Sequence, residues 1–158
     1  MKFSDQLERR FADLLTLYPI KRSALVPMLL YAQDEVGYVS EDVVRELASR
    51  LDLTDLEVRN VVSYYSMLHT RPIGKYNIQV CTNISCMLRG AEGVFDHIRK
   101  RLGIEHKQDT PDGLFHLEEV ECIGACCWAP AMQVNYSYHE NLTAEKVDEV
   151  LAALKRDL

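Results

Sequence analysis

The five cysteines constrain what this 158-residue chain can fold into more than any other feature, because none lies in the first eighty residues. They form two tight groups, Cys81 with Cys86, and Cys122 with Cys126 and Cys127. The N-terminus lacks an apolar core after its lysine, so we expect no secretion signal and a reducing compartment, where disulfide scaffolds are rare. Thiols that merely fill a core would rarely fall into two such groups. We therefore interpret the groups as a site.

Charge and hydropathy exclude several classes of function. The net charge is −6 at pH 7, which makes the chain a poor candidate for binding nucleic acid, whose phosphates require clustered Lys and Arg. The chain is equally unsuited to an anionic lipid surface. The longest apolar stretch, residues 24–32, contains Pro27 and is far too short to span a bilayer. We expect a cytoplasmic protein without direct membrane insertion, whose partners are proteins or small molecules.

The first 72 residues predict a helical domain. Apolar residues recur there at helical spacing, and no strand-like alternation interrupts them. Four local signals mark the ends of four helices. These signals are Ser4 as an N-cap, Gly37 at the end of a helix over residues 23–36, Ser40 as an N-cap, and a capping box formed by Thr54 and Glu57. We find no candidate chemistry among the apolar positions of this half.

A second domain is expected over residues 73–158, because residues 71–74 (RPIG) break the helical pattern. The expected elements are a strand over 75–80, a helix over 86–102, a strand over 114–121, strands near 131–135 and 138–140, and a helix capped by Thr143. Strand, helix, strand, strand, helix is typical of a small α/β domain of the thioredoxin-like kind. The whole chain is then α+β, with an N-terminal helical bundle (1–72) in front of that domain.

The two cysteine groups fall at two strand ends of this second domain. Cys81 ends the first strand and Cys86 opens the helix after it, in a C-x4-C spacing. Cys122 ends the next strand and Cys126 lies in the loop beyond it, in a C-x3-C spacing. Loops that leave two strands can meet at one end of a sheet. The four thiolates therefore predict a metal site.

The spacing favours one kind of metal site and leaves two alternatives open. Structural zinc favours C-x2-C knuckles and a thioredoxin-type dithiol needs C-x-x-C, and neither spacing is present. A Rieske centre needs two histidine ligands, and the five histidines lie outside both motifs. A [2Fe–2S] cluster suits two separated pairs, each holding one iron, and Gly90 and Gly124 let backbone N–H groups approach the sulfurs. Zinc and a metal-free site stay open at this point.

The residues around the cysteines carry a resemblance to a known family. Residues 80–90 (VCTNISCMLRG) and 121–130 (ECIGACCWAP) resemble the two cluster motifs of the thioredoxin-like [2Fe–2S] ferredoxins, and residues 110–115 (TPDGLF) resemble the turn before their second strand. In the helical half, Tyr38 and residues 61–65 (VVSYY) resemble one branch of the family. That branch is the small, E-type iron–sulfur subunit of the NADH dehydrogenase module of respiratory complex I, an NADH:quinone oxidoreductase. Related subunits serve NAD-reducing hydrogenases and NAD-dependent formate dehydrogenases.

The resemblance implies which residues bind the cluster. Matched residue by residue, the ligands are Cys81, Cys86, Cys122 and Cys126. Cys127 is an alternative to Cys126 as the fourth ligand, and the motif favours Cys126. The neighbouring Trp128 either packs beside the site as an ordinary apolar residue, or shields the cluster and touches a partner.

The resemblance also implies an electron carrier inside a larger enzyme, with no NADH oxidation by this chain alone. No Gly-rich phosphate loop follows a strand, and no nucleophile–base constellation stands out. A flavin-bearing, NADH-binding partner of the F type, with FMN and NADH, is expected to oxidise NADH, and the helical domain to dock it. Other subunits of the peripheral arm are further expected partners, with the assembly on the cytoplasmic side of the inner membrane. A zinc-binding adaptor without a redox role is the alternative from a different class.

Overall fold

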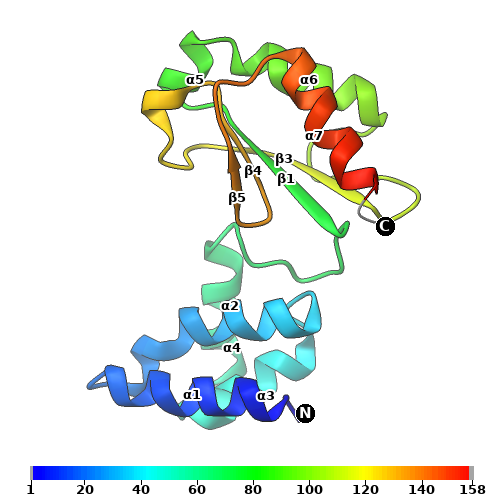
Figure 1. Cartoon of the computed structure of the whole chain (residues 1–158). Helices are drawn as coiled ribbons and strands as arrows, with labels where there is room; N and C mark the ends of the chain where they lie inside the picture. The colour runs from blue at the N-terminus through cyan, green and yellow to red at the C-terminus, as the bar shows by residue number, and fades with distance from the viewer. Residues whose placement is uncertain (1, 157–158) are drawn as a thin grey trace. The chain divides into compact units, whose positions relative to one another are not determined.

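The computed structural model describes residues 2–156 and divides the chain into two compact units (Figure 1). The division falls between Pro72 and Ile73. Each unit encloses a hydrophobic core of its own. Within the described residues, none of the helices combines the length and the apolar character that crossing a membrane requires.

Helices form the regular structure of the first unit. They are α1 (Asp5–Leu17), the 3-10 turn η1 (Lys21–Ala24), α2 (Leu25–Val36), α3 (Glu41–Leu51) and α4 (Asp55–Tyr64). The predicted caps are confirmed: the side chains of Ser4, Ser40 and Thr54 accept backbone N–H groups, Glu57 completes its capping box, and Gly37 ends α2. The helix predicted over 23–36 begins two residues later, at Leu25, because the ring of Pro27 clashes with the carbonyl four residues before it.

The second unit is a five-stranded mixed sheet with two long helices. Its elements are β1 (Tyr76–Cys81), α5 (Ile84–Leu88), α6 (Ala91–Leu102), β2 (Gln108–Asp109), β3 (Phe115–Val120), the 3-10 turn η2 (Cys126–Trp128), β4 (Met132–Val134), β5 (Ser137–His139) and α7 (Ala144–Arg156). The strand order is β2-β3-β1-β4-β5. β1 and β3 are parallel, and the other neighbours are antiparallel. The predicted α+β fold class is confirmed.

Alternation along β1 and β3 gives the sheet two different faces. Ile78 and Val80 on β1, with Phe115 and Leu117 on β3, join the core that α6 and α7 cover. The residues between them are polar and belong to the opposite face, which places Asn77 beside His116 in the register. The core therefore lies on one face of the sheet, and a polar array lies on the other.

Two local features differ from the sequence prediction. The helix predicted over 86–102 is two helices, because Gly90 adopts φ +90 between α5 and α6, a conformation that interrupts the helical hydrogen bonds. Cys86 therefore lies within the short α5 and not at the start of a long helix. The two-residue strand β2 was not predicted, because two residues carry no periodic signal.

Candidate metal centre

The strand order brings the ends of two parallel neighbours to the same edge of the sheet. Cys81, the last residue of β1, pairs in register with Val120, the last residue of β3. Cys86 follows in α5, and Cys122 and Cys126 follow β3 in the loop and in η2. Parallel neighbours end on the same side, so the four predicted ligands come from two loops at one end of the unit (Figure 1).

The first pair of thiols is buried and in contact. Cys81 and Cys86 are both about 2% exposed, and their thiols are hydrogen-bonded. Burial, and next the Cys81 thiol, raise the pKa of Cys86 to about 11 against an opposing backbone hydrogen bond from Ala131. A metal that binds here must displace this proton, so metal affinity falls as the pH falls.

The second pair, Cys122 and Cys126, is exposed, and Cys126 borders a hollow. Gly124, at φ +80, donates its backbone N–H to Sγ of Cys122, with 3.3 Å between nitrogen and sulfur. Cys126 lies close enough to Cys86 for its charge to help raise the pKa of Cys86. A hollow of about 330 Å³ opens here, lined by Ser85, Leu88, Arg89, Cys126, Cys127 and Ala129. The hollow beside Cys126 and Cys127 therefore has room for a group larger than one ion.

The donor set fits a two-iron cluster better than a single ion. Cys81 and Cys86 are in contact, Cys126 lies near Cys86, and Cys122 accepts the backbone N–H of Gly124. Structural zinc requires four ligands around one ion, whereas a [2Fe–2S] cluster is held by two pairs of thiolates and tuned by N–H groups at sulfur.

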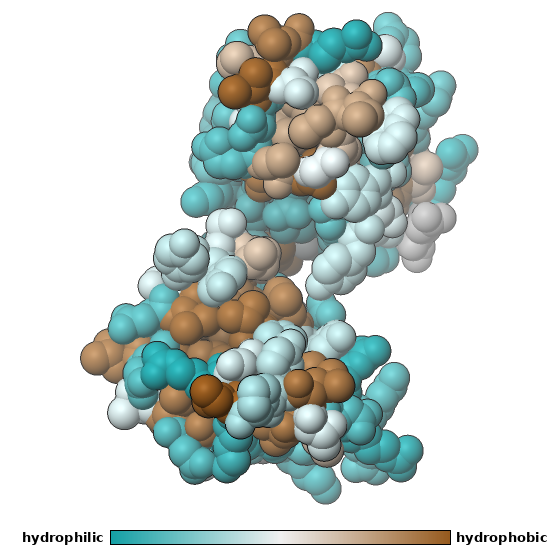
Figure 2. All heavy atoms as spheres, turned by 90° about the vertical axis from the view of Figure 1, so that its left-hand side faces the viewer, coloured by the Kyte–Doolittle hydropathy of each residue, from teal (hydrophilic) through white to brown (hydrophobic). Residues whose placement is uncertain are grey.

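Cys127 and Trp128 both lie at the surface of this end of the unit. Cys127 lines the same hollow as Cys126, so the identity of the fourth ligand stays a prediction. Trp128 is 52% exposed, which argues against a residue packed into the core. Ile84 and Leu88 on α5 are exposed as well, and Figure 2 shows apolar side chains at the surface of the α/β unit.

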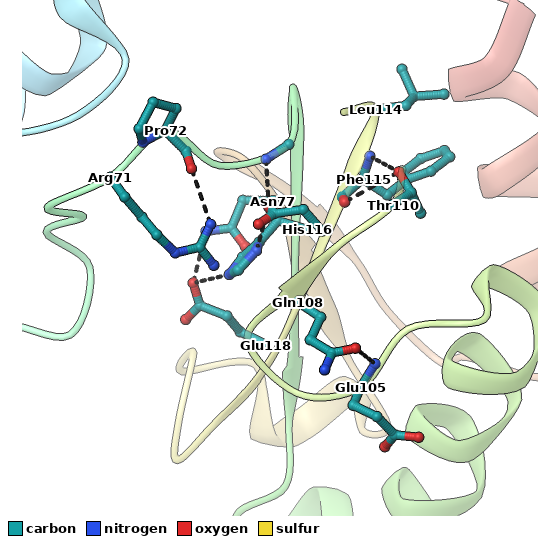
Figure 3. A network of polar contacts seen from close by, with 12 residues as sticks. Arg71, Pro72, Asn77, Glu105, Gln108, Thr110, Leu114, Phe115, His116 and Glu118 are labelled. Carbon is teal, nitrogen blue, oxygen red and sulfur yellow. Dashed lines mark hydrogen bonds and ion pairs between the residues drawn. The ribbon is translucent and has the colours of Figure 1, made fainter. Parts of the chain in front are cut away.

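Sequence reasoning missed a buried polar array on the opposite face of the sheet (Figure 3). His116, which is 2% exposed, lies with Nδ1 2.8 Å from Oδ1 of Asp109 and with Nε2 3.2 Å from Oε1 of Glu118. Burial favours the neutral ring, but the hydrogen bonds to Glu118 and Asp109 outweigh it and raise the pKa of His116. The available signal was the alternation of His116 and Glu118 with Phe115 and Leu117 along one strand.

Comparisons with known proteins identify a family and several relatives that this chain resembles. Residues 11–155 match the family described as thioredoxin-like [2Fe-2S] ferredoxin. The E-type subunit 2 of NADH-quinone oxidoreductase from Rhizobium meliloti is 43% identical over 87% of this chain and 82% of its own length. NADH-quinone oxidoreductase subunit 2 of Thermus thermophilus is 40% identical over 96% of this chain and 83% of its own length. The E-type subunit of the same enzyme from Mycobacterium bovis is 38% identical over 96% of this chain, which spans 60% of that protein.

One solved structure shares the fold over most of the chain. The crystal structure of an NAD+-reducing [NiFe]-hydrogenase in the air-oxidized state superposes with a TM-score of 0.75 at 21% sequence identity. The match covers 85% of this chain and 23% of the hydrogenase chain. At this identity the likeness establishes a common fold.

Proposed function

The chain belongs to the thioredoxin-like [2Fe–2S] ferredoxin family, and on this premise we propose that it is the electron-transfer subunit of an NADH:quinone oxidoreductase. The family match confirms the predicted cofactor, a [2Fe–2S] cluster, over zinc. The relatives are subunits of an oxidoreductase, which confirms the predicted enzyme class and the placement of the chain in a multi-subunit assembly.

The observation that carries the proposal is that the two thiol pairs follow β1 and β3, parallel neighbours that end at the same edge of the sheet. We propose Cys81, Cys86, Cys122 and Cys126 as the ligands. When bound, the cluster takes up and releases one electron at a time. The chain's own residues shape the site around it. The buried pair, Cys81 and Cys86, keeps water away from one side of the site, and the exposed pair, Cys122 and Cys126, leaves the other side accessible to a partner. The Gly124 N–H adds positive charge at Cys122.

We propose that the electron-donating partner approaches the exposed side of the site. We propose a flavin-bearing, F-type partner that holds FMN and NADH, with the helical unit as its docking platform. Exposed Ile84, Leu88 and Trp128 support an approach at the cysteine end, because transfer of an electron needs a short distance and apolar side chains favour a dry contact. Through that assembly the chain would lie on the cytoplasmic side of the inner membrane.

A second candidate is the equivalent subunit of an NAD-reducing hydrogenase or of an NAD-dependent formate dehydrogenase. The fold shared with the hydrogenase favours it, because the match covers most of this chain. Purification of the native assembly and identification of its other subunits separates the two candidates.

The experiment for the cofactor is analysis of the full chain purified without oxygen. We expect about two iron atoms and about two acid-labile sulfides per chain, with visible absorption, as one [2Fe–2S] cluster requires. Zinc without sulfide in a colourless protein overturns the proposal.

A further inference from the structure

Residues 74–76, near the start of the α/β unit, form hydrogen bonds with three different segments of that unit. The backbone N–H groups of Gly74, Lys75 and Tyr76 and the carbonyl of Lys75 all have hydrogen-bond partners. These partners are Oδ1 of Asp109 at 2.8 Å, the carbonyl of Gly113 at 3.0 Å, the carbonyl of Leu114 at 2.8 Å and Nδ2 of Asn135 at 3.2 Å. The chain is therefore fixed as soon as it enters the unit.

Gly74 makes the first of these contacts along the chain, and its backbone lies directly against β3. A Cβ atom on Gly74 would stand 2.4 Å from the carbonyl carbon of Phe115 and 2.6 Å from the backbone nitrogen of His116. Real Cβ atoms do not approach backbone atoms this closely, so the contact requires glycine. Its N–H is held by a side chain, Asp109, whereas Lys75 and Tyr76 donate to backbone carbonyls.

Asp109 is itself held in place by the buried array. The oxygen that accepts the Gly74 N–H is the one that lies 2.8 Å from Nδ1 of His116. The other ring nitrogen meets Glu118, which is 3% exposed and also accepts Nδ2 of Asn77 at 3.3 Å. Removing one member of such a buried charged array leaves its partner poorly satisfied, so the acceptor for Gly74 has little freedom to move.

We propose that Asp109, held by His116, is a positioning residue that fixes where the linker, residues 71–73 between the two units, enters the α/β unit. The consequence for electron transfer rests on the proposed function. If a partner docks on the helical unit, the linker is the covalent tie between the docked part and the part with the cysteines. An anchored entry point shortens the free length of this tie, so the cysteine site samples a narrower range of distances from the partner, and electron-transfer rates fall steeply with distance.

The test uses the full cluster-loaded chain and its flavin partner. Asp109→Ala removes the acceptor, Asp109→Asn keeps an oxygen for the Gly74 N–H, and Asp96→Ala removes an exposed carboxylate on α6 as the matched control. Hydrogen exchange at the Gly74 amide reports the anchor. The rate of NADH-dependent reduction through the partner reports delivery of electrons to the cluster. Reduction by dithionite reports whether the cluster itself is intact.

We expect Asp109→Ala to speed exchange at Gly74 by about tenfold or more, since a hydrogen bond to a charged acceptor is lost. It should slow NADH-dependent reduction several-fold and leave the dithionite-reduced spectrum unchanged, while Asp109→Asn and Asp96→Ala resemble the wild type. Equal exchange in Asp109→Ala and wild type, or faster exchange with unchanged delivery, overturns the inference.

Two further outcomes distinguish a failure of the proposed function from a failure of the Asp109 anchor. If wild-type protein is not reduced by NADH through the partner, the proposed function fails, while exchange at Gly74 still decides whether the anchor exists. If Asp109→Ala does not fold, exchange in the wild type decides the matter, because an unprotected Gly74 amide there overturns the anchor.

Discussion

The backbone N–H of Gly124 donates a hydrogen bond to Sγ of Cys122, with 3.3 Å between the two atoms. Gly124 reaches this position at φ +80, in the left-handed region that side chains rarely adopt. An N–H group aimed at sulfur places positive charge beside a thiolate ligand, and such hydrogen bonds shift the reduction potential of iron–sulfur clusters. The conformation of one glycine thus sets the electrostatics at one proposed ligand.

Gly124→Ala should therefore lower the reduction potential and the stability together. A side chain at this φ costs about 1–2 kcal/mol, and relief of the strain moves the N–H away from the sulfur. Gly93→Ala is the matched control, because Gly93 lies in α6 with nothing within 4 Å of an added Cβ. The control should gain about 0.5–1 kcal/mol with no change in potential. Spectroelectrochemistry and thermal unfolding measure both, and an unchanged or raised potential in Gly124→Ala contradicts the role of this hydrogen bond.

The identity of the fourth ligand is decided by a pair of adjacent substitutions. Cys126→Ala should lose or distort the cluster, whereas Cys127→Ala should keep it, because adjacent side chains diverge and the motif favours Cys126. Visible absorption and the paramagnetic signal of the reduced protein report the result. Serine at Cys81, Cys86 or Cys122 should also disturb the cluster, because a harder oxygen replaces a thiolate. Loss in Cys127→Ala with retention in Cys126→Ala shifts the ligand by one residue.

Local signals in the sequence predicted much of this molecule, and contacts between distant residues account for the rest. The box formed by Thr54 and Glu57 closes within one helical turn, so four residues suffice to recognise it. The meeting of Cys81 with Cys86 follows from the C-x4-C spacing after a strand. The burial of His116 could not be predicted, because it depends on Asp109 and on the register of two strands. A polar residue that alternates with apolar ones indicates only a second face.

The helical unit should depend on Arg50, which joins α3 to α1. Its guanidinium lies 2.6 Å from Glu8 and 2.8 Å from Glu46, and it stands over the rings of Phe3 and Phe11. Arg50→Met should destabilise this unit by about 1–3 kcal/mol, since two carboxylates lose a shared partner. Arg45→Met is the control, because Arg45 pairs with Asp42 at the surface, within the same helix turn. Denaturant unfolding measures both, and equal midpoints contradict the prediction.

Stability near neutral pH should carry opposite contributions from two histidines. Hydrogen bonds to Glu118 and Asp109 outweigh burial and raise the pKa of His116, so the folded state binds its proton more tightly than the unfolded state. This stabilisation is complete below the unfolded pKa of about 6.5 and is lost as the pH rises through the raised folded pKa. Burial lowers the pKa of His139, so its protonation destabilises the fold as the pH falls through about 6.5.

The measurement is the free energy of unfolding of wild type, His116→Gln and His139→Gln between about pH 5.5 and pH 8.5. The loss of stability in His116→Gln should be largest at the acidic end and shrink as the pH rises. His139→Gln should instead gain relative to wild type as the pH falls. Parallel curves for wild type and His116→Gln contradict the charged state assigned to the buried array.

NADH oxidation should require the flavin partner. Hydride transfer moves two electrons at once, and a [2Fe–2S] centre accepts one, so a flavin has to convert between them. We expect NADH added without oxygen to leave the visible spectrum of the isolated chain unchanged. Addition of the flavin-bearing partner should then produce the spectrum and paramagnetic signal of the reduced cluster. Rapid reduction of the isolated chain indicates a nucleotide site in this chain, and an active flavin partner that leaves the cluster oxidised contradicts its role as electron carrier.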